Sequence, residues 1–262
     1  MPSVKGPAES GCGPSVSGAE ASGHVPSGEG VAAGGYVVVD VEATGSSSRR
    51  HRVIELAVLL LDRDLAPEGE FTTLVDPQGP VGPTHIHGIE PGHIRGAPRF
   101  AGIAARLLTL LRGRVLVGHN VGCDRAFLAA EYARVGVRLP AVPEVCTMRM
   151  AADRRRDDPV PYGLSLRACV QALGVTGWTP HTALGDARAA AALFSHFVAQ
   201  SRATAGGAGA ADAAGLERRL LQAAGVRWPE APVPPTATTT LWKHRSNDSS
   251  RRSVPNVRNG SA

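Results

Sequence analysis

The chain has 262 residues, of which 43% are hydrophobic and only 4% aromatic, and its formal net charge is +5. This length suits one good hydrophobic core. The N-terminal part has no basic stretch followed by an apolar stretch, and no apolar run is long enough to cross a bilayer, so we expect a cytoplasmic protein without a membrane partner. The four cysteines are widely spaced and include no Cys-x-x-Cys pair. Neither a disulfide framework nor a cysteine zinc cluster is therefore indicated.

The first predicted element follows a segment without regular structure. Residues 1–34 are dominated by Gly, Ser, Ala, Pro and Glu and are predicted to be disordered. The run Tyr36–Gly45 (YVVVDVEATG) is rich in β-branched residues and ends at a turn-forming glycine, which predicts a buried strand. Because side chains alternate along a strand, Asp40 and Glu42 project from the same face.

Asp40 and Glu42 form an acidic pair at the edge of an apolar run. Two adjacent carboxylates raise each other's pKa unless a cation neutralises them. Hard divalent ions such as Mg²⁺ and Mn²⁺ prefer oxygen ligands of this kind. An isolated Asp-x-Glu pair is more often a solvated pair at the end of a strand, so it does not by itself establish a metal site.

Two further strands and a helix are predicted next. The apolar runs 53–61 and 71–75, linked by a polar turn, suggest that the first three strands form an antiparallel meander. Helical periodicity follows over residues 100–111. The basic segment 49–52 before the second strand suits either a phosphate-contacting loop or a solvated turn.

The second acidic motif lies in residues 115–128, which predict a short strand, a polar turn and a helix. The helix is expected to begin near Gly122 and to end near Gly136. Asp124 falls in its first turn. This position also suits an ordinary helix-dipole residue, since acidic side chains are favoured at helix N-termini.

The third motif, residues 180–188 (PHTALGDAR), follows a strand predicted near 142–147 and a helix near 164–173. It opens an alanine-rich helix predicted over 182–200. On a continuous helix, His181 and Asp186 would lie roughly 140° apart, so His181 is expected in the preceding loop. Pro180 supports this by disfavouring helix at Thr179. A histidine on such a loop suits a proton acceptor better than a rigid metal ligand, although a helix-start histidine without a role is the alternative.

Together the three motifs carry a resemblance to a known family. Asp-x-Glu-x-Thr-Gly at 40–45, His-Asn-x-x-x-Asp-x-x-Phe-Leu at 119–128 and His-x-x-x-x-Asp at 181–186 resemble the DEDDh (DnaQ-like) 3′→5′ exonucleases, whose best-known member is the proofreading epsilon subunit of bacterial DNA polymerase III. The resemblance covers residues 35–200. Within this range, residues 84–89 resemble the family's segment that packs against the terminal nucleotide of the substrate. It implies a ribonuclease H-like three-layer α/β fold, with a mixed central sheet of an antiparallel meander plus parallel strands flanked by helices.

The resemblance also implies roles for individual residues. It implies that two divalent cations, Mg²⁺ or Mn²⁺, are held by the acidic residues Asp40, Glu42, Asp124 and Asp186. His181 is the expected general base of a reaction that removes nucleoside 5′-monophosphates from 3′ ends. The candidates for binding the substrate end are Thr44, Ile86, His87, Ile89 and Asn120.

Two positions depart from the family pattern. Cys123 stands where the family usually has a bulky aromatic residue, and Thr182 follows the histidine where arginine is frequent. We expect altered packing near Asp124 and altered substrate contact from these changes.

The C-terminal part is predicted to lie outside the exonuclease domain of residues 35–200. Residues 201–215, rich in Ala and Gly, suggest a linker, residues 216–228 a short helix, and residues 229–262 a disordered basic tail. Nine basic and four acidic residues in 201–262 give this part a charge of +5. Such a tail suits nonspecific phosphate contact or simple solvation.

Two other functions stay open at this point. The first is an RNA-trimming exonuclease of the same family, because no residue in the sequence indicates whether the 2′-hydroxyl is recognised. The second is a catalytically silent binding module that accompanies a polymerase, although the intact acidic residues and histidine argue against it. The expected partners are single-stranded nucleic-acid 3′ ends, with DNA favoured over RNA, and a DNA polymerase subunit.

Overall fold

The structure is a computed structural model that describes residues 34–154, 163–203 and 208–230. The segments 1–34 and 229–262 were predicted to be disordered. All of their residues except 34, 229 and 230 lie outside the described residues. Within these ranges, no helix is long and apolar enough to cross a membrane.

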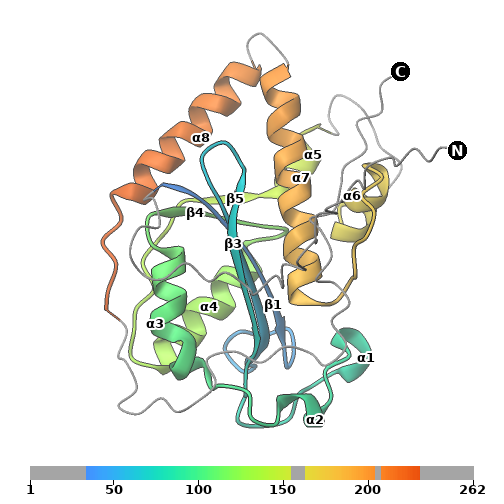
Figure 1. Ribbon diagram of the computed structural model, residues 1–262, viewed down its shortest axis with the longest axis vertical. Helices are drawn as coiled ribbons and strands as arrows, with labels where there is room; N and C mark the ends of the chain where they lie inside the picture. Colours follow the sequence, from blue (N-terminus) through green and yellow to red (C-terminus); the bar gives the residue numbers. More distant parts are fainter. Residues whose placement is uncertain (1–33, 155–162, 204–207, 231–262) are drawn as a thin grey trace, which may run out of the picture.

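A five-stranded mixed sheet forms the centre of the domain (Figure 1). Its strands are β1 (Gly35–Ala43), β2 (Val53–Leu61), β3 (Pro67–Leu74), β4 (Arg114–Gly118) and β5 (Glu144–Cys146). They lie in the order β3-β2-β1-β4-β5, with β1, β2 and β3 antiparallel and β1, β4 and β5 parallel. The predicted meander and mixed sheet are confirmed. The strand that carries the first acidic motif, β1, is central.

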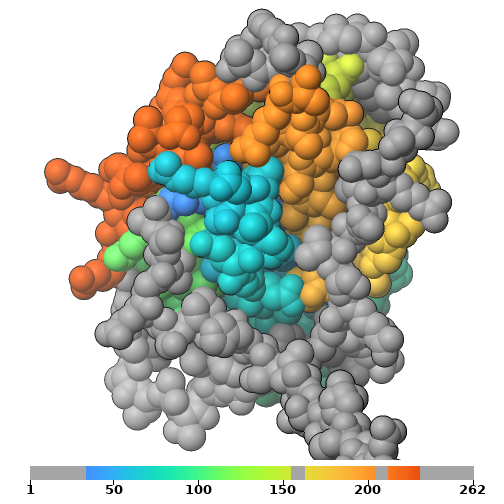
Figure 2. All heavy atoms as spheres, turned by 45° about the horizontal axis from the view of Figure 1, so that its top comes forward, coloured from blue at the N-terminus to red at the C-terminus, as the bar shows by residue number. Residues whose placement is uncertain are grey.

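Helices cover both faces of this sheet (Figure 1). On one face, α3 (Phe100–Leu111) and α4 (Gly122–Arg134) pack over Val37 and Val39 of β1. On the other face, α7 (Ala183–Ala203) and α8 (Ala208–Ala224) pack over Tyr36 and Val38. The edge strand β3 reaches the surface between α7 and α8 (Figure 2). The three-layer α/β architecture predicted from the sequence is therefore confirmed.

In the described part of the chain, four shorter helices lie in the connections between these elements. They are α1 (Thr84–His87), α2 (Pro91–Ile94), α5 (Thr147–Arg154) and α6 (Leu166–Ala172). Only α6 corresponds to a predicted helix. The others run for one or two turns, too short for a 3.6-residue apolar period to repeat.

The Ala- and Gly-rich segment after the third motif is mostly helical. Because α7 extends to Ala203 and α8 begins at Ala208, the predicted linker 201–215 is wrong for residues 201–203 and 208–215. Alanine has the highest helix propensity, and Leu220 and Ala223 are buried beside α7, so docking outweighs the cost of the glycines.

One end of the sheet collects the three acidic motifs. The parallel strands β1 and β4 end there, and the N-terminal ends of α4 and α7 approach it from opposite faces (Figure 1). The carboxyl ends of parallel strands are where α/β sheets place their ligand sites.

Candidate active site

Asp40 and Glu42 continue the side-chain alternation of β1 beyond its buried half. Tyr36 and Val38 point toward α7, so Asp40 and Glu42, at the next even positions, point the same way. The strand changes here from fully buried to half-buried residues. The predicted common face of the two carboxylates follows directly from this register.

Asp186 completes a compact acidic cluster with this pair. It lies in the first turn of α7. Carboxylate oxygens of Asp40, Glu42 and Asp186 lie within 4.8 Å of one another. The cluster is therefore able to hold a metal ion with oxygen ligands alone.

Asp124 reaches the same cluster from the opposite layer. It lies in the first turn of α4, is 6% exposed, and accepts a hydrogen bond at 3.2 Å from the backbone N–H of Val41. Its charge acts on Asp40, and the charge of Asp186 acts on Asp124. The structure thus brings together all four acidic residues that the sequence singled out.

Three carboxyl groups at this site, those of Asp40, Asp124 and Asp186, have raised pKa values. Burial, followed by the charges of Asp124, Asp186, Glu42 and Glu55, raises the pKa of Asp40 well above its ordinary value. Burial likewise raises the pKa of Asp124 to about 7. It also raises the pKa of Asp186, against the opposing effect of that group's hydrogen bonds. The sequence predicted raised pKa values from mutual repulsion, whereas burial is the larger cause.

His181 lies just before α7, as predicted. Its backbone is left-handed, with φ of 59°, and its side chain is exposed. Its backbone N–H donates to Oδ2 of Asp186 at 3.3 Å, and its charge interacts with that carboxylate. The imidazole therefore lies at the rim of the acidic cluster rather than inside it.

Two side chains that the sequence did not single out also support α7. Glu55 of β2 is 5% exposed and accepts a hydrogen bond at 2.8 Å from the backbone N–H of Ala183. The indole N–H of Trp178 donates to Oδ1 of Asp186 at 2.8 Å. A charged residue inside the apolar run 53–61 was the only sequence signal for Glu55, and Trp178 had none.

Thr182 has a clear structural role at the position where the family often has arginine. Its hydroxyl accepts a hydrogen bond at 3.1 Å from the backbone N–H of Gly185 and donates one at 3.1 Å to the carbonyl of Thr179. Satisfying a backbone donor in the first turn is the role of a helix N-cap. At the other departure, the exposed Cys123 accepts a hydrogen bond from Asn120.

The proposed substrate-binding residues differ in accessibility. Ile86 is 50% exposed and Asn120 is also exposed, whereas His87 and Ile89 are 2% and 0% exposed. The ring of His87 accepts a hydrogen bond from the backbone N–H of Ile89. In this conformation, burial therefore gives His87 and Ile89 a packing role and leaves them unavailable to a nucleotide.

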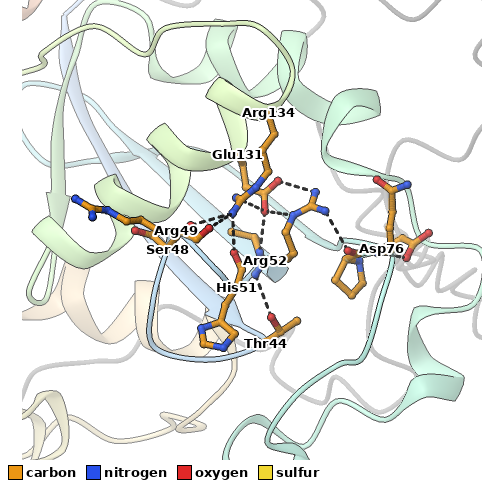
Figure 3. Close-up of polar contacts among 11 residues, drawn as sticks. Thr44, Ser48, Arg49, His51, Arg52, Asp76, Glu131 and Arg134 are labelled. Carbon is orange, nitrogen blue, oxygen red and sulfur yellow. Dashed lines mark hydrogen bonds and ion pairs between the residues drawn. The ribbon is translucent and has the colours of Figure 1, made fainter.

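Thr44 belongs to the loop 44–52 that joins β1 to β2, which a charged cluster holds in place (Figure 3). Glu131 of α4 receives two hydrogen bonds from Arg52, at 2.8 and 2.9 Å. The guanidinium group of Arg134 donates to three backbone carbonyls of this loop, those of Ser48, Arg49 and His51. Arg52 is thus committed to the fold, which leaves Arg49 and Arg50 as the exposed cations of the basic segment.

Comparison with known proteins agrees with this geometry. The family described as Exonuclease (RNase_T) matches residues 37–194. A Mycobacterium tuberculosis protein described as a bifunctional exonuclease/endonuclease is 32% identical over 161 residues, which cover 58% of this chain and 25% of that protein. A PolC-type DNA polymerase III of Streptococcus agalactiae is 31% identical over 117 residues, or 44% of this chain and 8% of that protein.

Among solved structures, E. coli exonuclease I in complex with a dT13 oligonucleotide has a similar fold. The TM-score is 0.54 and the identity 18%, over 62% of this chain and 40% of that one. The chain therefore spans less than half the length of each of these relatives. The match of the family over residues 37–194, together with the acidic cluster, shows that the chain belongs to the Exonuclease family, in its DnaQ-like 3′→5′ group.

Proposed function

We propose that this chain is a metal-dependent 3′→5′ exonuclease that releases nucleoside 5′-monophosphates from DNA 3′ ends. The observation that carries the proposal is the approach of the Asp40, Glu42 and Asp186 carboxylate oxygens to within 4.8 Å of one another. Four acidic groups in one partly buried place stay ionised together only beside cations.

The proposed cofactors are two divalent cations, Mg²⁺ or Mn²⁺, and the proposed ligands are Asp40, Glu42, Asp124 and Asp186. A donor set made only of carboxylate oxygens suits hard cations. The raised pKa values of Asp40, Asp124 and Asp186 also fit, since a bound cation replaces protons at such groups. When bound, the ions would supply an activated water and neutralise charge on the phosphate.

His181 is the proposed proton acceptor. Its exposed side chain is accessible to both water and substrate at the N-terminal end of α7. The neutral imidazole would take the proton of the attacking water at a ring nitrogen. The backbone N–H of the same residue donates a hydrogen bond to the carboxylate of Asp186, which keeps this residue beside the proposed metal site.

Single-stranded DNA is the proposed substrate, in keeping with the DNA oligonucleotide bound by exonuclease I and with the polymerase relatives. Thr44, Ile86 and Asn120 are the proposed contacts with the 3′ end, because they are partly or fully exposed. A cytoplasmic location and a DNA polymerase subunit as partner belong to the same proposal.

Digestion of 5′-labelled single strands tests this proposal. DNA and RNA of matched sequence are incubated with Mg²⁺, Mn²⁺ or chelator, and the products are resolved on a gel. We expect a metal-dependent ladder that shortens from the 3′ end of DNA, and loss of the ladder in Asp40→Asn. Preferential digestion of RNA would show that RNA, rather than DNA, is the substrate. If neither strand is digested with any metal, the proposed enzymatic activity is wrong and the binding module is favoured.

A second variant tests the base separately from the metal site. His181→Ala should bind metal as the wild type does, measured by thermal stabilisation with Mn²⁺, yet digest DNA about 10²- to 10⁴-fold more slowly. Undiminished digestion by this variant would remove His181 from the mechanism.

A further inference from the structure

One short stretch of chain donates two hydrogen bonds to the carboxylate of Asp186. The indole N–H of Trp178 donates to Oδ1 at 2.8 Å, and the backbone N–H of His181 donates to Oδ2 at 3.3 Å. The same carboxylate faces Asp40 and Glu42 in the acidic cluster. Residues 178–181 therefore hold the Asp186 carboxylate by hydrogen bonds, while the same carboxylate takes part in the cluster that is able to bind a cation.

The turn of residues 177–182 is docked closely on the first turn of α7. Gly185 permits this approach, because a Cβ atom there would lie only 2.1 Å from the carbonyl oxygen of Thr179. The hydroxyl of Thr182 bridges the same carbonyl and the backbone N–H of Gly185. The turn consequently has a fixed position relative to Asp186.

The ring of Trp178 is anchored by apolar packing. It packs against an apolar cluster that includes Val175, Ala189 and Ala192. An indole has one N–H donor and no acceptor. The packed ring and the single hydrogen bond together define one orientation of this side chain, with its donor directed at Asp186.

We propose that Trp178 is a positioning residue, which orients the Asp186 carboxylate for divalent-cation binding and ties it to the turn that carries His181. The inference deepens the proposed function and rests on its metal site. Trp178 lies outside the three acidic motifs. Groups that hydrogen-bond to metal-ligating side chains typically change metal affinity or activity by about 10- to 100-fold when they are removed.

Trp178→Phe is the direct test, because it keeps an aromatic ring and removes the N–H. We expect the Mn²⁺ concentration at half-maximal thermal stabilisation to rise about tenfold. The turnover number at saturating Mn²⁺ should fall much less than this, since excess metal compensates for weaker binding. A merely structural role would lower the metal-free melting temperature without moving the half-saturation point.

Trp228→Phe is the matched control. Trp228 packs with the core on the opposite face of the sheet, and its indole nitrogen has no hydrogen-bond partner in the described part of the chain. This variant should show the Mn²⁺ curve of the wild type. A wild-type curve for Trp178→Phe as well would overturn the proposal.

Fluorescence gives a second test that does not depend on the folding of Trp178→Phe. The chain has three tryptophans, Trp178, Trp228 and Trp242, so changing the last two to Phe leaves Trp178 as the only one. Titration with Mg²⁺ should change the emission of Trp178. The Mg²⁺ concentration at half of this change should equal the Mg²⁺ concentration at half-maximal thermal stabilisation. Constant emission while Mg²⁺ stabilises the protein would contradict the proposed contact.

The outcomes separate this inference from the function on which it rests. If the wild type binds metal and digests DNA but Trp178→Phe is indistinguishable from it, only the role of Trp178 is overturned. If the wild type shows neither metal stabilisation nor digestion, the proposed function fails and the inference fails with it.

Discussion

The carboxyl group of Asp124 shows how one buried side chain couples the fold to the chemistry of the site. It is 6% exposed and its charged form is stabilised by the backbone N–H of Val41. Burial nevertheless raises its pKa to about 7, with a further contribution from the charge of Asp186. In the metal-free protein this group therefore keeps its proton almost to neutral pH.

We predict that this proton makes the stability of the metal-free protein depend on pH. The group's ordinary pKa is 3.8 and its folded pKa is about 7. The protonated group stabilises the fold fully below about pH 4, and this contribution is lost as the pH rises to about 7. Asp124→Asn carries no charge at any pH. In chelator, its melting temperature relative to wild type should be higher at pH 8 than at pH 5 by about 5 °C. An equal difference at both pH values would contradict this assignment.

Residues of the site differ in how far they can be predicted from sequence. The common face of Asp40 and Glu42 follows from the two-residue period of a strand, and the loop position of His181 follows from its spacing to Asp186. Glu55 supports Ala183, which is 128 positions away, so no local pattern reports the contact. Trp178 is only eight positions from Asp186, but its direction depends on a tertiary turn.

At the scale of elements, Glu131 joins α4 to the loop 44–52. Its side chain is 1% exposed and accepts hydrogen bonds from Arg52, from Arg134 and from the backbone N–H of Val53 (Figure 3). The loop begins at Thr44, directly after the acidic pair of β1. Glu131 therefore fixes the path of the chain as it leaves the candidate active site.

We predict that Glu131→Ala destabilises the fold by about 3 kcal/mol, because both guanidinium groups lose a buried carboxylate partner. The free energy of unfolding in urea measures this loss. Glu144→Ala is the control, since it breaks a pair of similar length, 2.8 Å to Arg125, between side chains that are 29% and 45% exposed. The control should lose less than about 1 kcal/mol. Equal losses of unfolding free energy in the two variants would show that the buried pairs of Glu131 stabilise the fold no more than the exposed pair of Glu144 does.

Elements with a long apolar period were the most predictable. The helix predicted over residues 100–111 has these bounds in the structure. The boundary of α8 was missed because glycine and alanine together resemble a linker in composition, whereas tertiary docking through Leu220 decides the outcome. The short helices α1, α2 and α5 were missed because they are too short to show a repeated apolar period, so tertiary contacts decide their conformation.

At the scale of the whole molecule, the carboxylates of the acidic cluster repel one another when they are ionised, and a bound cation relieves this repulsion. We predict that Mn²⁺ raises the melting temperature and that chelator reverses the rise. At a hundredfold excess over its dissociation constant, a ligand stabilises the folded state by about 2.7 kcal/mol. For a domain of this size that corresponds to roughly 5 to 10 °C. Asp40→Asn should show little of this rise, and an equal rise in the variant would contradict a metal site at Asp40.

The overall architecture was predictable because three motifs, spaced over about 150 residues, each mark the end or the start of a regular element. The order of strands and helices alone indicates only an α/β domain. The antiparallel pairing of β1 with β2 follows from their succession along the chain. The parallel pairing of β1 with β4 joins segments that are distant in sequence, and the family resemblance was needed to anticipate it.

The origin of Asp124 and Asp186 in opposite layers has a consequence for the life of the protein in a cell. One comes from α4 and the other from α7, and these helices cover different faces of the sheet. All four carboxylates meet only after both layers have docked. A nascent or partly unfolded chain lacks the complete cluster, so we expect it to be inactive, which makes the proposed activity a property of the finished fold alone.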